Sequence, residues 1–222
     1  MRIMLYNLYR GGQGRLDTIV KVVNAARPDF LGILEAVLWG DDEQTTLRQF
    51  AQQVRLPCSY FVKSNTKYDI AFLNGKPPLK ARRFRKNFRH SAMLAECTLA
   101  HLQVAIVLLH LDPRREENRL EELRRVRALI APYRHVILMG DFNSLSPHDP
   151  YDRSSLLHLF QERGIEKFGA EQLRFDCIEF VESLGLIDVM RALKKPFVST
   201  VPTPSNEDKM HAVLKTGGKQ YR

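Results

Sequence analysis

A series of short apolar segments constrains the fold of this chain more than any other sequence feature. Segments of this length, bounded by polar or turn-forming residues, are typical of buried strands: 2–7, 30–34, 60–62, 70–73, 93–99, 103–109 and 136–139. Helical periodicity occupies the intervening stretches 16–27, 43–56, 116–131, 154–163 and 178–184. Helices alternate with strands at first, and strands then follow one another between residues 60 and 109. This mixture predicts an α/β sandwich of two sheets flanked by helices rather than a purely parallel sheet.

The composition is that of an ordinary globular protein with room for one sizeable core. The chain has 222 residues, of which 44% are hydrophobic and 27% charged. Its three cysteines, Cys58, Cys97 and Cys177, are scattered and not spaced as metal ligands, and the first residues lack a signal core. We therefore expect a reduced, cytoplasmic, monomeric protein with no membrane segment. A formal charge of +9 favours an anionic partner such as nucleic acid.

Polar residues stand where several of the predicted strands end. Asn7 ends the first strand, Glu35 the second and His110 the strand 103–109, while Asp141 and Asn143 follow the strand 136–139. Strand ends of layered α/β proteins converge on one edge, where ligand sites form. Each residue also has an ordinary structural interpretation, as a turn former, a helix cap or a solvated side chain. Carboxylate and amide oxygens are nevertheless the ligands that Mg²⁺ prefers.

Two motifs in this series resemble those of a known family. His110 lies in Leu-Leu-His-Leu-Asp at 108–112, and Met-Gly-Asp-Phe-Asn follows at 139–143. Together they resemble the His-Leu and Gly-Asp-Phe-Asn motifs of the endonuclease/exonuclease/phosphatase superfamily, which is DNase I-like. Asn7 and Glu35 match its first two motifs in order. The resemblance covers about residues 1–210 and implies a four-layer α/β/β/α sandwich of two mixed sheets.

The same resemblance implies an activity and its residues. It indicates a phosphodiester hydrolase that depends on Mg²⁺, with Mn²⁺ as an alternative. It assigns metal binding to Glu35 with Asn7 beside it, and catalytic roles to His110, Asp141 and Asn143. Asp69, at the start of the strand 70–73, is interpreted as an exposed carboxylate at a strand end. The alternative is that Asp69 orients the imidazole of His110.

The C-terminal part departs from the family pattern. Family members normally continue with an Asp-Tyr-Ile-like strand and an Asp-His pair, and neither occurs in these 222 residues. Residues 211–222 form an atypical basic tail, which is interpreted as a junction or, alternatively, as a disordered terminus. We therefore expect a domain 1–210 whose C-terminal strands are missing or replaced and whose turnover is weak or absent. A non-catalytic nucleic-acid-binding member is the alternative.

A basic segment follows the strand 70–73. Its cations are interleaved with Phe84 and Phe88, a pattern suited to tracking a phosphate backbone: Arg82, Arg83, Arg85, Lys86 and Arg89. A solvated basic face with its phenylalanines packed inward is the alternative. Nucleic acid is the predicted partner, and phosphatase or phospholipid phosphodiesterase activity on the same fold is the rival.

Overall fold

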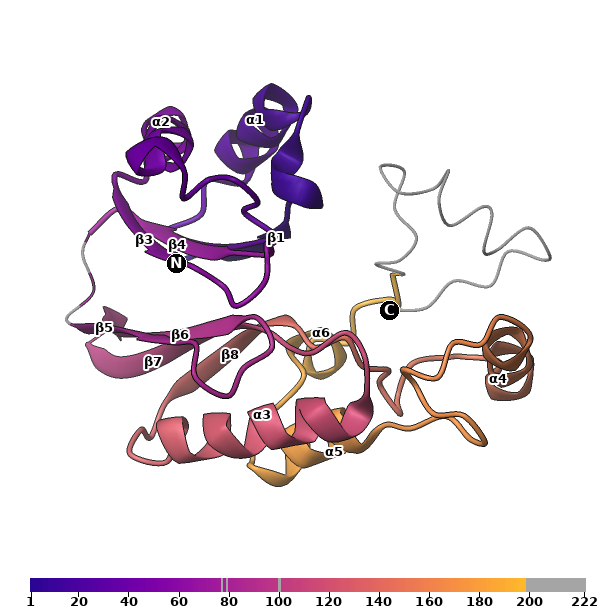
Figure 1. Ribbon diagram of the computed structural model, residues 1–222. Helices are drawn as coiled ribbons and strands as arrows, with labels where there is room; N and C mark the ends of the chain where they lie inside the picture. Colours follow the sequence, from indigo (N-terminus) through magenta and orange to yellow (C-terminus); the bar gives the residue numbers. More distant parts are fainter. Residues whose placement is uncertain (77, 79, 100, 199–222) are drawn as a thin grey trace. The chain divides into compact units, whose positions relative to one another are not determined.

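The structure, a computed structural model, describes residues 1–76, 78, 80–99 and 101–198. The chain forms two compact units, one of residues 1–111 and 128–142, the other of residues 112–127 and the chain from 143 onward. Most elements of both units are labelled in Figure 1. Within the described residues, no helix is long and apolar enough to cross a bilayer.

The first unit is built on two four-stranded mixed sheets. One sheet has the order β1-β2-β4-β3, with β1 (Ile3–Asn7), β2 (Phe30–Leu34), β3 (Cys58–Val62) and β4 (Ile70–Asn74). The other has the order β5-β6-β7-β8, with β5 (Lys80–Phe84), β6 (Ser91–Leu99), β7 (Leu102–His110) and β8 (Val136–Asp141). The pairs β1–β2 and β7–β8 are parallel and the others antiparallel. The predicted α/β fold with two mixed sheets is confirmed.

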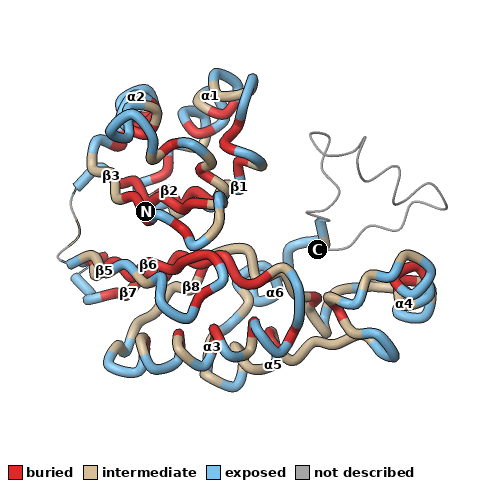
Figure 2. Tube along the Cα trace, in the orientation of Figure 1, coloured by how far each residue is buried: buried red, intermediate tan, exposed pale blue. Residues whose placement is uncertain are grey.

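The two sheets pack face to face through fully apolar side chains. Leu34, Val62, Ile70 and Phe72 from the first sheet share one core with residues of β6, β7 and β8. Figure 2 shows buried residues concentrated along the strands. Gly32 of β2 belongs to this contact, because an added Cβ would lie 2.6 Å from the Met139 side chain. A side chain at position 32 would therefore collide with the opposite sheet.

Two helices cover the outer face of the β1-β2-β4-β3 sheet (Figure 1). They are α1 (Leu16–Ala26) and α2 (Thr45–Gln53), each preceded by a short 3₁₀ turn, η1 (Arg10–Gly12) and η2 (Asp42–Gln44). Their buried residues join alternate residues of β2 in a second core. Helix α1 ends at Ala26 because Arg27 takes a left-handed conformation and Pro28 follows.

The second unit is helical in its described part. It holds most of α3 (Glu116–Ile130), together with α4 (Arg153–Glu162), α5 (Asp176–Ser183) and α6 (Val189–Ala192). A small core of Leu145, Leu156, Phe160 and Phe168 lies within it. Between residues 143 and 198 the structure contains no strand. The expected replacement of C-terminal strands, the boundary at residue 210 and the tail 211–222 lie outside the described residues.

Candidate active site

Four polar side chains meet at the edge of the first unit where β1, β2, β7 and β8 end, which we call the rim. Parallel pairing sets Asn7 beside Leu34, the last residue of β2, and His110 beside Asp141. The Asn7 amide nitrogen lies 3.4 Å from Glu35 Oε1 and 3.4 Å from Asp141 Oδ2. The structure thus brings together two carboxylates that belong to different sheets.

Main-chain groups fix the orientation of Glu35 and Asn7. The Arg10 N–H donates to Glu35 Oε2 at 3.0 Å, and the Tyr9 N–H donates to Asn7 Oδ1 at 3.0 Å. Because Oδ1 accepts this bond, the amino group of Asn7 faces the carboxylates. Glu35 itself has φ 56°, a left-handed conformation that costs on the order of 1–2 kcal/mol in a residue other than glycine. Such backbone strain is typical of functional sites.

The loop after β1 is held against the loop after β2 by a glycine. Gly11 has φ 75°, and an added Cβ would lie 2.4 Å from the carbonyl oxygen of Val37. Its N–H donates to the Glu35 carbonyl at 2.8 Å, and its own carbonyl accepts from the buried Trp39 indole at 3.0 Å. Only glycine fits this close approach, so Gly11 supports the position of Glu35. The sequence reading assigned no role to Gly11 or Trp39.

His110 lies beside this group in an aromatic setting. Its side chain is almost completely buried, and its Nε2 lies 3.9 Å from Asp141 Oδ2. The ring stacks on His90 with centroids 4.4 Å apart, and His90 Nδ1 lies 2.6 Å from the Thr66 hydroxyl. Tyr68 packs edge-on against His90 at 5.5 Å. The sequence reading missed His90, because no motif or spacing marks it as the partner of His110.

Asp69 is buried rather than exposed, so its interpretation as an exposed carboxylate at a strand end is wrong. Its carboxylate accepts from the Ser64 N–H at 2.7 Å and from Lys63 Nζ at 3.2 Å. Burial raises the pKa of this carboxyl above its ordinary value, an effect that the two donors oppose. Among the described residues the carboxylate makes no hydrogen bond to His110, although the Asp69 carbonyl accepts from the Ala36 N–H next to Glu35.

Asn143 belongs to the second unit. There it has φ 49°, and its Oδ1 lies 3.5 Å from Lys167 Nζ. The next residue, Ser144, donates to the Glu116 carboxylate at 2.9 Å.

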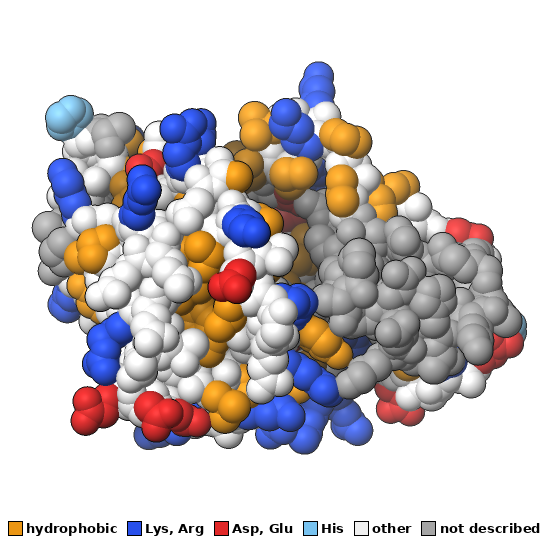
Figure 3. Space-filling view, turned by 90° about the horizontal axis from the view of Figure 1, so that it is seen from above, with side chains coloured by type: hydrophobic (Ala, Val, Ile, Leu, Met, Phe, Trp, Pro, Cys, Tyr) orange, Lys and Arg blue, Asp and Glu red, His pale blue; other side chains and the backbone are white. Residues whose placement is uncertain are grey.

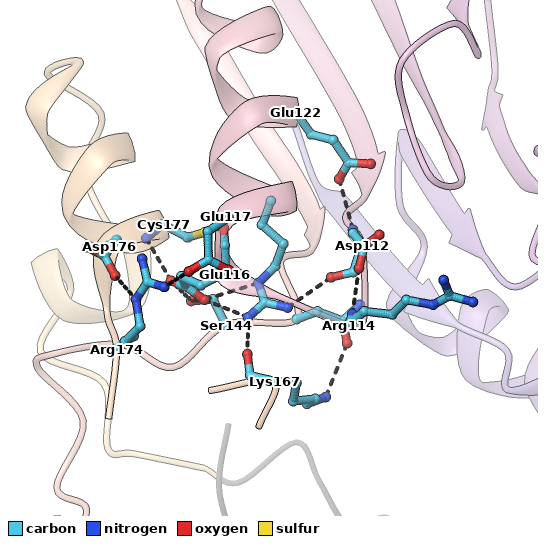
Figure 4. A network of polar contacts seen from close by, with 12 residues as sticks. Asp112, Arg114, Glu116, Glu117, Glu122, Ser144, Lys167, Arg174, Asp176 and Cys177 are labelled. Atoms are coloured by element: carbon cyan, nitrogen blue, oxygen red, sulfur yellow. Dashed lines mark hydrogen bonds and ion pairs between the residues drawn. The ribbon is translucent and has the colours of Figure 1, made fainter. Parts of the chain in front are cut away.

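Glu116 is the centre of the buried polar network in Figure 4, which the sequence reading did not foresee. Its carboxylate accepts from Arg119 at 2.6 Å and from the Cys177 N–H at 2.9 Å. Arg119 is fully buried and also donates to the Asp112 and Lys167 carbonyls. These bonds join α3, α5 and the segment after the Gly-Asp-Phe-Asn motif.

The basic segment contains one half-buried cation and several exposed ones. Arg82 on β5 is half-buried and donates to the Tyr133 hydroxyl at 2.8 Å, and that hydroxyl donates to Glu96 at 2.5 Å. Phe88 is buried, so this phenylalanine packs inward. The remaining predicted cations are exposed: Arg83, Arg85, Lys86 and Arg89. Figure 3 shows Lys and Arg side chains at several places on one face of the molecule rather than in one patch.

The donor atoms at the rim suit a hard divalent cation. Glu35 and Asp141 supply carboxylate oxygens, and the Asp141 side chain is 38% exposed and therefore reachable from solvent. No group of three or more His, Cys, Asp or Glu residues able to hold a metal occurs in the described part of the chain. Mg²⁺ fits a site with two carboxylates, because it usually binds one or two of them and keeps several waters.

Comparison with known proteins identifies the family. The profile of the Endonuclease/Exonuclease/phosphatase family matches residues 4–161, which is more than half of the chain. The chain belongs to this family. The family unites enzymes that hydrolyse phosphoesters, as its name states. A search of the curated proteins found no match.

Solved structures resemble this chain. An AP endonuclease from Archaeoglobus fulgidus is 14% identical, with 94% of this chain and 82% of that chain covered and a TM-score of 0.66. A truncated TDP2 from Caenorhabditis elegans is 22% identical, with 64% of this chain and 61% of that chain covered and a TM-score of 0.49. The match covers 47% of a longer form of that TDP2. At these identities the AP endonuclease supports the fold alone.

Proposed function

We propose that this family member is a Mg²⁺-dependent phosphodiester hydrolase that acts on nucleic acid. The observation that carries the proposal is the position of Glu35 and Asp141. Their carboxylates come from different sheets and lie at equal distances, 3.4 Å, from one amide nitrogen. Holding two like charges beside each other at a solvent-accessible edge is unfavourable unless a cation binds between or beside them.

Each residue at the rim has a defined part in this proposal. Glu35 and Asp141 would hold the cation, which when bound neutralises charge on the phosphoryl oxygens and favours deprotonation of a water. Asn7 keeps the two carboxylates in place through its amino group. Asp141 also orients the attacking water, and His110, fixed by its stacking on His90, donates from Nε2 to a phosphoryl oxygen. Asn143 is assigned to the phosphate by its place in the Gly-Asp-Phe-Asn motif.

The choice of nucleic acid as substrate is supported by charge. The chain has a formal charge of +9, and four of the five predicted basic residues are exposed. A polyanion gains from such a surface through release of its counterions, whereas a small phosphate ester contacts only the rim. The substrate is therefore proposed to be a nucleic acid strand rather than a phospholipid or inositol phosphate.

Hydrolysis assays test the proposal. We expect Mg²⁺-dependent cleavage of plasmid DNA, RNA or bis(p-nitrophenyl) phosphate, and a loss of about 10²–10³-fold in Glu35→Gln, since the variant removes charge stabilisation at the reacting group. Glu43→Gln is the matched control, because Glu43 is an exposed acid in η2 of the same unit. Cleavage that is equally fast in both variants, or independent of divalent ions, would contradict the proposal.

A further inference from the structure

We infer that two loops at the rim form the track for the phosphate backbone of the substrate. The rim loops are residues 63–69, between β3 and β4, and residues 85–90, between β5 and β6. The inference rests on the proposed function, because it takes the substrate to be a nucleic acid strand. The cations of this track differ from the five basic residues predicted from the sequence, because Lys67 is included and Arg82 is left out.

Strand pairing sets both rim loops beside the candidate site. The loop 63–69 ends at Asp69, whose carbonyl accepts from the N–H of the residue after Glu35 at 2.8 Å. The loop 85–90 ends at His90, which stacks on His110 at 4.4 Å, and the next residue, Ser91, pairs with His110. A strand with its reacting phosphate at Glu35, Asp141 and His110 therefore passes these loops.

The side chains of Asn65 and Thr66 join the rim loops. The Asn65 amide nitrogen donates to the Arg85 carbonyl at 2.7 Å and to the Phe88 carbonyl at 2.8 Å. The Asn65 N–H also donates to the His90 carbonyl at 3.2 Å. Together with the contact between the Thr66 hydroxyl and His90 Nδ1 at 2.6 Å, these bonds hold one loop against the other, and Phe88 is buried. Because the loops are fixed before the substrate arrives, little conformational entropy is lost on binding.

The rim loops present cations to solvent and no large apolar side chain. Lys67, Arg85, Lys86 and Arg89 are exposed. None of the exposed large hydrophobic side chains in the described residues lies in these loops. Membrane-surface binding would need such side chains, whereas contacts with phosphates need only the cations. The loops therefore fit a nucleic acid backbone better than a lipid surface.

Arg82 has a different part. Its guanidinium is engaged with the Tyr133 hydroxyl, which also bonds Glu96, so it secures the edge strand β5. Its cross-strand partner is Leu94 of β6. Binding to the track is consequently expected to depend on the loop after β5 and not on this strand residue.

Salt-dependent binding of the full chain tests the inference. The probe is a fluorescein-labelled single-stranded oligonucleotide of about 16 nucleotides, the upper end of the usual footprint of one domain. Its affinity is measured in EDTA over a range of salt concentrations. For the double variant Arg85→Ala/Lys86→Ala we expect binding about tenfold weaker and a slope of log K against log salt smaller by about 1.4, since each phosphate contact contributes about 0.7.

Two further variants make the test specific. Lys21→Ala/Arg48→Ala removes the same charge from exposed positions on α1 and α2 and should leave affinity and slope near wild type. Asn65→Ala removes the two side-chain bonds of Asn65 between the rim loops without changing charge and should weaken binding. Equal losses in the two double variants, or tighter binding of anionic vesicles than of the oligonucleotide, would overturn the inference.

The small ester bis(p-nitrophenyl) phosphate separates this inference from the proposed function. It is too short to reach along the loops, so its hydrolysis by the wild type reports on the candidate site alone. If the wild type cleaves the ester but the affinity for the oligonucleotide does not depend on the rim loops, the inferred track is wrong and the proposed hydrolase activity is retained. If the affinity for the oligonucleotide depends on the rim loops and neither substrate is cleaved, the inferred track is retained and the proposed hydrolase activity is wrong.

Discussion

At the scale of single residues, two carboxylates near the same edge of the sheets have opposite environments. Glu35 is half-buried, and its carboxylate and carbonyl accept main-chain N–H bonds that leave the side chain at the rim. Asp69 is fully buried, with its carboxylate turned to Ser64 and Lys63. Glu35 is therefore suited to a ligand, while Asp69 anchors the loop 63–69.

The titration of Asp69 is expected to affect stability. Burial raises the pKa of this carboxyl above its ordinary value of 3.8, so the folded protein favours the protonated form. The contribution of protonated Asp69 to the free energy of unfolding is fully present below the ordinary pKa. It is lost as the pH rises through the raised pKa of the folded protein. Measured by urea unfolding, wild type should lose stability relative to Asp69→Asn over that window. A wild-type stability that stays constant or rises relative to that of Asp69→Asn as the pH increases would be the contrary result.

The site could be predicted from the sequence where strand ends determine it. Asn7, Glu35, His110 and Asp141 each follow a recognisable apolar segment, and parallel pairing of neighbouring strands sends such ends to one edge. The stacking of His90 on His110 was not predictable, because it depends on the antiparallel register of β6 and β7. Register follows from tertiary packing, which the sequence pattern does not display.

At the scale of elements, apolar periodicity decided which strands and helices could be predicted from the sequence. Strand β2 (Phe30–Leu34) has the predicted bounds, since it is buried along its length. Strand β5 (Lys80–Phe84) was missed because Lys-Ala-Arg-Arg-Phe has no apolar alternation. Pairing with β6 and the bonds of Arg82 and Tyr133 stabilise it instead. Helix α6 (Val189–Ala192) was missed because four residues show no periodicity.

Helix α3 offers a comparison of two ion pairs on one element. Glu116 is buried with Arg119 at 2.6 Å, whereas Glu121 is 51% exposed beside Arg124 at 3.1 Å. Glu116→Gln should lower the free energy of unfolding by about 3–5 kcal/mol, because it leaves the buried Arg119 charge uncompensated. Glu121→Gln should cost less than about 1 kcal/mol. Urea denaturation followed by circular dichroism measures both, and similar losses would show that the network is not a buried ion pair.

At the scale of the whole molecule, the class of fold was predictable and its connectivity was not. Strands in succession between residues 60 and 109 indicated two sheets, and the structure confirms both as mixed sheets. The order β1-β2-β4-β3 is set by the core between and outside the sheets rather than by any local signal. The same long-range packing brings Asn7 to Asp141 across 134 positions of the chain.

Binding of Mn²⁺ followed by electron paramagnetic resonance tests the central claim, that Glu35 and Asp141 serve one divalent ion. We expect one site in the wild type and in the control Glu43→Gln, and at least about tenfold weaker binding in Glu35→Gln and in Asp141→Asn. Because both carboxylates serve the same ion, the double variant should lose less than the sum of the two single losses in free energy. Unchanged Mn²⁺ affinity in either single variant, or fully additive losses, would contradict the account.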